Sequence, residues 1–217
     1  MSKTILAFHS SYFDCSISLL HNNNIYHENK KCNQNQTIYI LPMIKNILKI
    51  NFINLHEIKI IAISTGPGNF IGIRTSIAIA QGLSLGLNIP IVTLPAPLIM
   101  AEQVWKTLNK NRVLMISKKN NQDMYLEKYV KREENFWIKK KSKKILSIKE
   151  VQKKLSSLKK SWTIIGNYSK LISKNIYKNL IFSNIYSPNA QFIITLYLSN
   201  KRYQKSSLSY KIFPRYF

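Results

Sequence analysis

The chain has 217 residues, 45% of them hydrophobic, which excludes a disordered chain and suffices for one domain or two small ones. Its net charge of +24 comes from 33 Lys and Arg against 9 Asp and Glu, so carboxylates are too scarce to expect the acidic cluster of a metal-dependent nuclease. The positive charge favours nucleic acid or another acidic partner. Abundant Asn, Ile, Tyr and Lys, whose codons are rich in A and T, make compositional drift an equal alternative.

The first fifty residues predict three strands followed by a helix. Apolar or alternating patterns predict strands at residues 4–10, 15–20 and 25–31. The helix is capped from within residues 33–35 and ends near Ile50, and Pro42 lies inside its apolar pattern. Cys15 and Cys32 alone make neither a disulfide framework nor a zinc site, and the N-terminus has no apolar run of signal-peptide length. We therefore expect a cytoplasmic protein.

The next region predicts a parallel crossover unit built on a glycine turn. Its strands are expected at residues 58–64 and 89–94, its turn at 65–69, and its helices at 70–87 and 97–108. The helix at 70–87 is unusual because it is apolar or small on every side, which indicates burial on more than one side. Its uncharged part spans only residues 75–87, short of the ~20 residues that a bilayer requires, so we reject a membrane span. The second side of this helix needs a cover within the chain or on a partner.

After residue 110 the pattern is more basic and less regular. Strands are expected at residues 113–117, 124–130, 162–165 and 180–182, and helices at 147–158, 170–177 and 190–199. Ser147 and Glu150 form a capping-box pattern, and the lysine-rich run 139–144 predicts a solvated loop. We place the domain boundary near residues 109–111, which gives domains 1–109 and 110–217.

No residues group as a catalytic or metal-binding motif. His9, His21, His27 and His56 lack the spacing of zinc ligands, and no Gly-Lys-Ser/Thr follows the glycine turn as in a Walker loop. Gly66, Gly68 and Asn69 precede a helix N-terminus and could face a phosphate, although Pro67 removes one backbone donor. The alternative, which we favour, is that the glycines serve a sharp strand-to-helix turn.

A long segment resembles the signature of a known family. Residues 65–74, TGPGNFIGIR, and the continuation AQGL at 80–83 are similar to the GPGSFTGxR…AxGLA pattern of the TsaB (YeaZ) family. The segments at residues 5–7 and 41–43, with Tyr125 and Tyr129, agree with this resemblance. It implies an α/β, actin-like ATPase (ribonuclease H-like) fold with two subdomains, each a mixed sheet with crossover helices. The N-terminal subdomain would carry the partner-binding helices, and the C-terminal one would be smaller and divergent.

The resemblance implies a non-catalytic subunit without a cofactor or metal. TsaB proteins pair with the catalytic subunit TsaD and act with the ATPase TsaE, in a complex that transfers threonylcarbamoyl to an adenosine next to the tRNA anticodon. The tRNA would be bound through the complex, and some members form homodimers by the same surface. Partner contacts are expected from the helices at 36–50 and 70–87, at Leu41, Ile44, Lys45, Leu48, Arg74, Ile77, Ala78, Ala80, Gln81 and Ser84.

The chain departs from the family pattern at positions expected to border the cleft between the subdomains. His9 replaces a common Asp, Gln36 a common His, and Lys118 and Asn120 a common Asp and Arg, while Asn69 and Ile71 stand where the signature has Ser and Thr. These changes make nucleotide binding in that cleft an open question. Two alternatives remain: a stand-alone basic tRNA-binding or ribonuclease H-like module, and an ATP-dependent kinase of the same superfamily.

Overall fold

The structure is a computed structural model that describes residues 3–32, 35–118, 120–132, 136–140, 145–167, 177–199, 203–204 and 212–216. Contacts between residues divide the chain into two units. The first unit is Met1–Ile99 with Pro188–Tyr216, and the second is Met100–Ser187. The helix predicted at 170–177 lies outside the described residues except for Tyr177.

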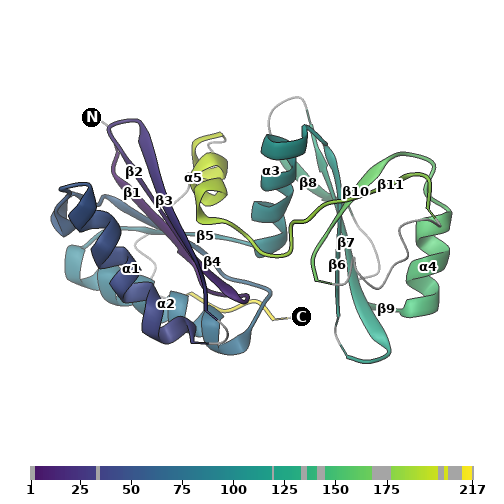
Figure 1. The fold of residues 1–217 in the computed structure, drawn as a ribbon, viewed down its shortest axis with the longest axis horizontal. Coiled ribbons are helices and arrows are strands. Elements are labelled where there is room, and N and C mark those ends of the chain that lie inside the picture. The colour runs from purple at the N-terminus through teal and green to yellow at the C-terminus, as the bar shows by residue number, and fades with distance from the viewer. Residues whose placement is uncertain are drawn as a thin grey trace. The chain divides into compact units, whose positions relative to one another are not determined.

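The first unit contains a mixed sheet covered on both faces (Figure 1). Its described elements are β1 (Ile5–His9), β2 (Asp14–His21), β3 (Asn24–Lys31), α1 (Gln36–Ile50), a 3-10 turn (Leu55–Glu57), β4 (Ile60–Ser64), α2 (Phe70–Leu87), β5 (Ile91–Leu94) and α5 (Ala190–Ser199). The strand order is β3-β2-β1-β4-β5, with β1, β4 and β5 parallel and the β1-β2-β3 meander antiparallel. α1 and α2 lie along one face of the sheet, and α5 lies on the other.

The core of this unit forms where the strands are apolar along their whole length. β1 and β4 are buried at every position, as expected of central strands covered on both faces. Between them and the helices lies one cluster that includes Phe8, Ile61, Ile40 and Ile73. The sequence predicted every strand of this sheet and the bounds of α2.

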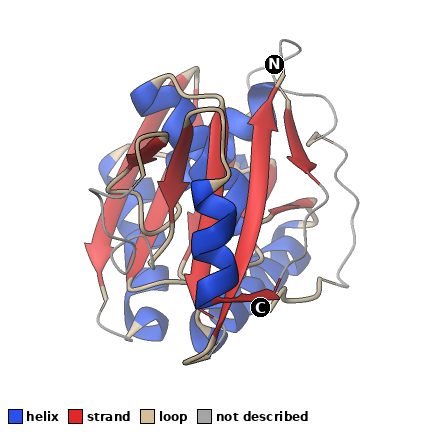
Figure 2. Ribbon diagram, turned by 90° about the vertical axis from the view of Figure 1, so that its right-hand side faces the viewer, coloured by secondary structure: helices blue, strands red, loops and turns tan. Residues whose placement is uncertain are grey.

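The second unit repeats the same strand arrangement. Its described elements are β6 (Arg112–Lys118), β7 (Asp123–Lys131), β8 (Trp137–Lys140), β9 (Ile145–Ser147), α4 (Ile148–Ser156), β10 (Trp162–Ile165) and β11 (Leu180–Phe182). The order β8-β7-β6-β10-β11 matches that of the first sheet, and β9 pairs with β7. α4 lies over the strands (Figure 2), with Val151 and Leu155 in the core. The predicted capping box is present, because Ser147 and Glu150 each accept from the other's backbone N–H.

The structure differs from the sequence predictions in the second sheet, where neither β8 nor β9 was predicted, and in the division of the chain. Lys139 and Lys140, expected in a loop, belong to β8, which pairs with β7 over its whole length. The expected division at residue 109 also differs from the division by contacts, because α5 packs on β1, β2 and β4 of the first sheet. α3 (Ala96–Leu108) contains the point where the first unit ends and the second begins.

Candidate functional site

α2 has a buried side and an exposed side that are both apolar. The buried side repeats at helical spacing and comprises Gly72, Ile73, Ser76, Ile77, Ala80 and Ser84. The exposed side includes Ile71, Arg74, Ala78, Gly82 and Leu85, with Ile71 56% and Leu85 61% exposed. Among the described helices, α2 alone has the length and mean hydropathy of a membrane span, but it packs along β1, β4 and β5. An exposed apolar row of this length suits contact with another protein.

α1 extends this exposed area. It covers the same face of the sheet as α2 and contacts it. Ile38 and Leu41 of α1 are more than half exposed, and Lys45 follows Leu41 by one turn. We call the following residues the α1–α2 surface: Ile38, Leu41, Lys45, Ile71, Arg74, Ala78, Gly82 and Leu85.

The residues predicted for a partner interface divide into two groups. Leu41, Lys45, Arg74 and Ala78 are exposed and belong to the α1–α2 surface, and Gln81 is half-buried. The others are buried and are corrected to core positions: Ile44, Leu48, Ile77, Ala80 and Ser84. Four of them pack in the main cluster of the first unit, and the Ser84 hydroxyl donates to the Ile89 carbonyl at 2.5 Å. The exposed Ile71, Gly82 and Leu85 were missed, although their spacing with Arg74 and Ala78 was visible in the sequence.

The glycine turn uses its backbone amides within the chain. Asn69 Oδ1 accepts from the N–H groups of Ile71 and Gly72, at 3.0 and 3.5 Å, as an N-cap. The N–H of Asn69 itself donates to the Ser11 carbonyl at 2.5 Å. A Cβ on Gly68 would collide with the Ser11 carbonyl, so glycine permits this close approach. The amides of Asn69, Ile71 and Gly72 thus have partners within the chain, which favours the structural interpretation of Gly66, Gly68 and Asn69.

The C-terminal residues reinforce this turn. The N–H of Arg215 donates to the Thr65 carbonyl at 2.8 Å, and Gly66 has φ +96°, with no room for a Cβ beside the Arg215 carbonyl. The ring of Tyr216 stacks on Phe70 with 5.4 Å between centroids. Arg74 Nε donates to Tyr216 Oη at 3.0 Å, and its guanidinium lies 3.7 Å from the Phe70 centroid. Arg74 is therefore held in place at the N-terminal end of the α1–α2 surface.

His9, at the end of β1, is a buried neutral imidazole. Burial lowers the pKa of His9 to about 4, against the opposing effects of the Asp14 carboxylate and the Pro188 carbonyl. Its Nδ1 accepts from the N–H of Ser11 at 3.4 Å. An uncharged, fully buried ring supplies no negative charge that could hold a cation here. Gln36 is equally buried, and its Nε2 donates to the Tyr12 carbonyl at 2.7 Å.

Replacing His9 by Asn is expected to flatten the dependence of stability on pH. Below pH 6.5 the unfolded chain binds a proton at His9 that the folded chain binds only near pH 4, so the free energy of unfolding falls as the pH falls through this window. The total loss is about 3 kcal/mol at His9 alone. Urea unfolding of both proteins at several pH values between 4 and 7 measures this. Parallel profiles for the two proteins would rule out His9 as the source.

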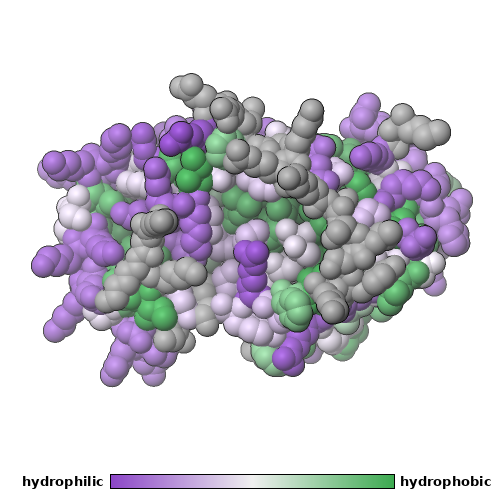
Figure 3. Space-filling model, turned by 180° about the vertical axis from the view of Figure 1, so that it is seen from behind, coloured by the Kyte–Doolittle hydropathy of each residue, from purple (hydrophilic) through white to green (hydrophobic). Residues whose placement is uncertain are grey.

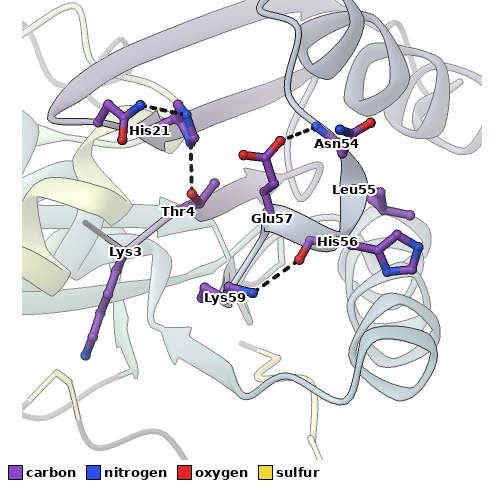
Figure 4. A pocket seen from close by; sticks show the side chains of 9 residues that line it. Lys3, Thr4, His21, Asn54, Leu55, His56, Glu57 and Lys59 are labelled. Carbon is purple, nitrogen blue, oxygen red and sulfur yellow. Dashed lines mark hydrogen bonds between the residues drawn. The ribbon is translucent and has the colours of Figure 1, made fainter. Parts of the chain in front are cut away.

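A pocket of about 1090 Å³ opens at the edge of the first unit (Figure 4). Within it Thr4 Oγ1 lies 2.9 Å from His21 Nδ1, and Asn22 Nδ2 lies 2.9 Å from His21 Nε2. The Thr4 hydroxyl and the Asn22 amide thus hold the His21 ring through its two nitrogens.

The other candidate positions do not form a metal site. No group of three or more His, Cys, Asp or Glu side chains that could hold a metal ion occurs among the described residues. The Asn120 carboxamide accepts from the N–H groups of Gln122 and Asp123, which fixes the turn between β6 and β7. Lys118, the last residue of β6, is exposed.

The two mixed sheets, each in the order of a three-stranded meander followed by two parallel strands, define an α/β protein of the actin-like (ribonuclease H-like) class. Residues 24–184 match a family model named TsaD and described as tRNA N6-adenosine threonylcarbamoyltransferase. The tRNA threonylcarbamoyladenosine biosynthesis protein TsaB of Buchnera aphidicola subsp. Baizongia pistaciae is 46% identical over 100% of this chain and 98% of its own length. The chain belongs to the TsaB family.

More distant relatives agree with this assignment. TsaB of Escherichia coli strain K12 is 29% identical, over 75% of this chain and 70% of that protein. The solved structure of YeaZ from Pseudomonas aeruginosa covers 98% of this chain and 100% of its own, with a TM-score of 0.80 at 19% identity. A second structure, described as an uncharacterized protein with similarity to peptidase YEAZ from the same organism, gives a TM-score of 0.82 at 20% identity over 99% of each chain. The two structures support the fold.

Proposed function

We propose that the chain is a non-catalytic subunit that a TsaD-type catalytic subunit requires to transfer threonylcarbamoyl from its adenylate to tRNA adenosine. Membership of the TsaB family gives the pathway, since the relatives are named as tRNA threonylcarbamoyladenosine biosynthesis proteins. The observation that carries the proposed role is the exposed apolar row of α2. An exposed apolar row on a helix that packs against the core is suited to a stable complex with another protein.

The partner would be the TsaD-type subunit, bound through the α1–α2 surface. Ala78 and Gly82 carry little or no side chain, and a Cβ on Gly82 meets nothing within 4 Å, so a partner helix can approach the α2 backbone closely. Ile71 and Leu85 flank these small residues with apolar side chains, and Arg74 supplies a positioned cation. The alternative is that two copies of this chain form a homodimer through the α1–α2 surface.

Several observations support a role without chemistry of its own. The described residues hold no cluster of metal-ligating side chains, and the amides of Asn69, Ile71 and Gly72 at the glycine turn are bonded within the chain. His9 is neutral and buried where a cation-holding acid would be needed. A TsaE-type ATPase would join the larger complex in the cytoplasm, tRNA would be bound through that complex, and neither a membrane nor a cofactor of this chain is needed.

The test is reconstitution with the TsaD-type protein of the same cell. We expect the catalytic subunit, with TsaE-type protein, tRNA and threonylcarbamoyl adenylate, to transfer threonylcarbamoyl only when this chain is added. We expect none from this chain without the catalytic subunit. Transfer at an equal rate without this chain would contradict the proposal, as would transfer by this chain without the catalytic subunit.

A further inference from the structure

The two faces of the second sheet carry different charge arrangements. On β7, Glu127, Tyr129 and Lys131 point to one face, because alternate residues of a strand face the same way. Both ion pairs found among the described residues lie on this face: Lys139 bonds Glu127, and Lys131 bonds Glu102 of α3 at 2.5 Å. Here the cations are matched by carboxylates.

The opposite face of the same sheet carries cations without such matching. Strand register places Arg112, Lys128 and Lys140 on this face, since Lys128 pairs with Lys140 and Arg112 pairs with Val130, two residues beyond Lys128. Lys154 of α4 joins them. Within the part of the chain that the structure describes, none of these four side chains forms an ion pair. We call Arg112, Lys128, Lys140 and Lys154 the basic face.

The basic face holds its cations close together. The ammonium of Lys128 lies 5.5 Å from the ring centroid of Trp162. Burial and then the charge of Lys154 lower the pKa of Lys128, so the two ammonium groups repel each other in the free chain. A bound anion would relieve this repulsion. Hydrophilic side chains occupy much of the surface seen in Figure 3. Compositional drift alone would add lysines to both faces of the second sheet alike. It would not place the lysines that pair with carboxylates on one face and the unpaired cations on the other.

We propose that the basic face binds the phosphate backbone of RNA. Adjacent ammonium groups on neighbouring strands and on α4 suit a row of phosphates, and lysines act as point charges toward phosphate without reading base sequence. We favour RNA over an acidic protein as the ligand because the TsaB relatives are named as tRNA threonylcarbamoyladenosine biosynthesis proteins. Only this choice of ligand rests on the proposed function. The chain would then contribute tRNA contacts in addition to docking the catalytic subunit.

The experiment measures binding of the purified chain to an unmodified tRNA transcript over a salt series. The test variant changes Lys128, Lys140 and Lys154 to Gln. The matched control changes the exposed Lys31, Lys59 and Lys110 to Gln, which removes the same charge elsewhere. We expect the test variant to bind tRNA at least about tenfold more weakly, with the slope of log affinity against log salt reduced by about 3. We expect the control variant to keep nearly the affinity and the slope of the unchanged chain.

Three results would overturn the inference. One is absence of tRNA binding by the unchanged chain even at low salt, and another is an equal loss in both variants, which would assign binding to overall charge. The third is unchanged tRNA affinity in the test variant with loss of co-purification with the catalytic subunit, which would assign the basic face to an acidic protein. Because tRNA binding uses the chain alone, its failure is distinguishable from failure of the proposed function.

Discussion

Replacing Glu102 by Ala is expected to lower the free energy of unfolding by about 3–5 kcal/mol, the cost of leaving one buried charge without its partner. Glu102 Oε2 accepts from Lys131 Nζ at 2.5 Å and from Trp137 Nε1 at 2.7 Å, and both charged side chains are buried. Lys131 also lies 5.2 Å from the Trp105 centroid. The substitution therefore leaves an ammonium and an indole N–H without an acceptor among apolar rings.

A matched control exists in the same unit. Glu127→Ala removes the partly exposed pair with Lys139, which solvent screens, and the acceptor of the Tyr129 hydroxyl, so we expect a smaller loss of about 1–2 kcal/mol. The double variant Glu102→Ala with Lys131→Met is expected to recover part of the loss, because no charge is then left buried. Urea unfolding followed by tryptophan fluorescence measures all three. Equal losses for Glu102→Ala and Glu127→Ala would contradict the assignment of Glu102 to a buried pair.

Gly82→Arg is expected to weaken binding to the TsaD-type subunit at least about 30-fold, or about 2 kcal/mol, while the chain stays folded. Gly82 lies in the middle of the exposed row of α2, and a Cβ there meets no atom within 4 Å, so the free chain accommodates the side chain. Replacing Gly within a helix also raises stability, by up to about 1 kcal/mol. In a complex, the guanidinium would hold the partner helix away from the α2 backbone.

Three further variants separate docking from folding. Gly82→Ala keeps the surface small and is expected to bind normally. Ala80→Arg is expected to unfold the chain, because Ala80 is fully buried, and Ser76→Arg likewise, because the Ser76 hydroxyl lies 2.7 Å from that of Ser10 in the core. Thermal melting establishes which variants are folded, and co-purification with the catalytic subunit measures docking. Normal binding by folded Gly82→Arg would exclude α2 as the docking helix.

The sequence predicted the elements well where one pattern dominated. The apolar runs at β1 and β4 and the glycine turn before α2 have clear local causes, and the structure confirms them. The side of α2 that faces the sheet was harder to predict, because Ile77 and Ala80 on the buried side resemble Ile71 and Ala78 on the exposed side. Hydrophobicity alone does not distinguish two apolar sides, and only the packing of the helix on its sheet does.

Features that depend on distant contacts could not be read from the sequence. The lysines of β8 predicted a loop, yet Lys139 bonds Glu127 across the sheet and Trp137 bonds Glu102 on α3. The contacts of the C-terminal residues likewise join Arg215 to Thr65 and Tyr216 to Arg74, which lie far apart in the chain. No periodic pattern marks such single contacts.

We propose that this chain supports threonylcarbamoyl transfer by docking through α2. The most direct test titrates the chain, unchanged or with Leu85→Ala, into a fixed amount of catalytic subunit, TsaE-type protein, tRNA and threonylcarbamoyl adenylate. Leu85 is exposed, so its truncation removes partner contact of about 1–2 kcal/mol without disturbing the core. We expect a half-saturating concentration about 5- to 30-fold higher for Leu85→Ala, with the same maximal rate. An unchanged half-saturating concentration, or a lower maximal rate that excess chain does not restore, would contradict it.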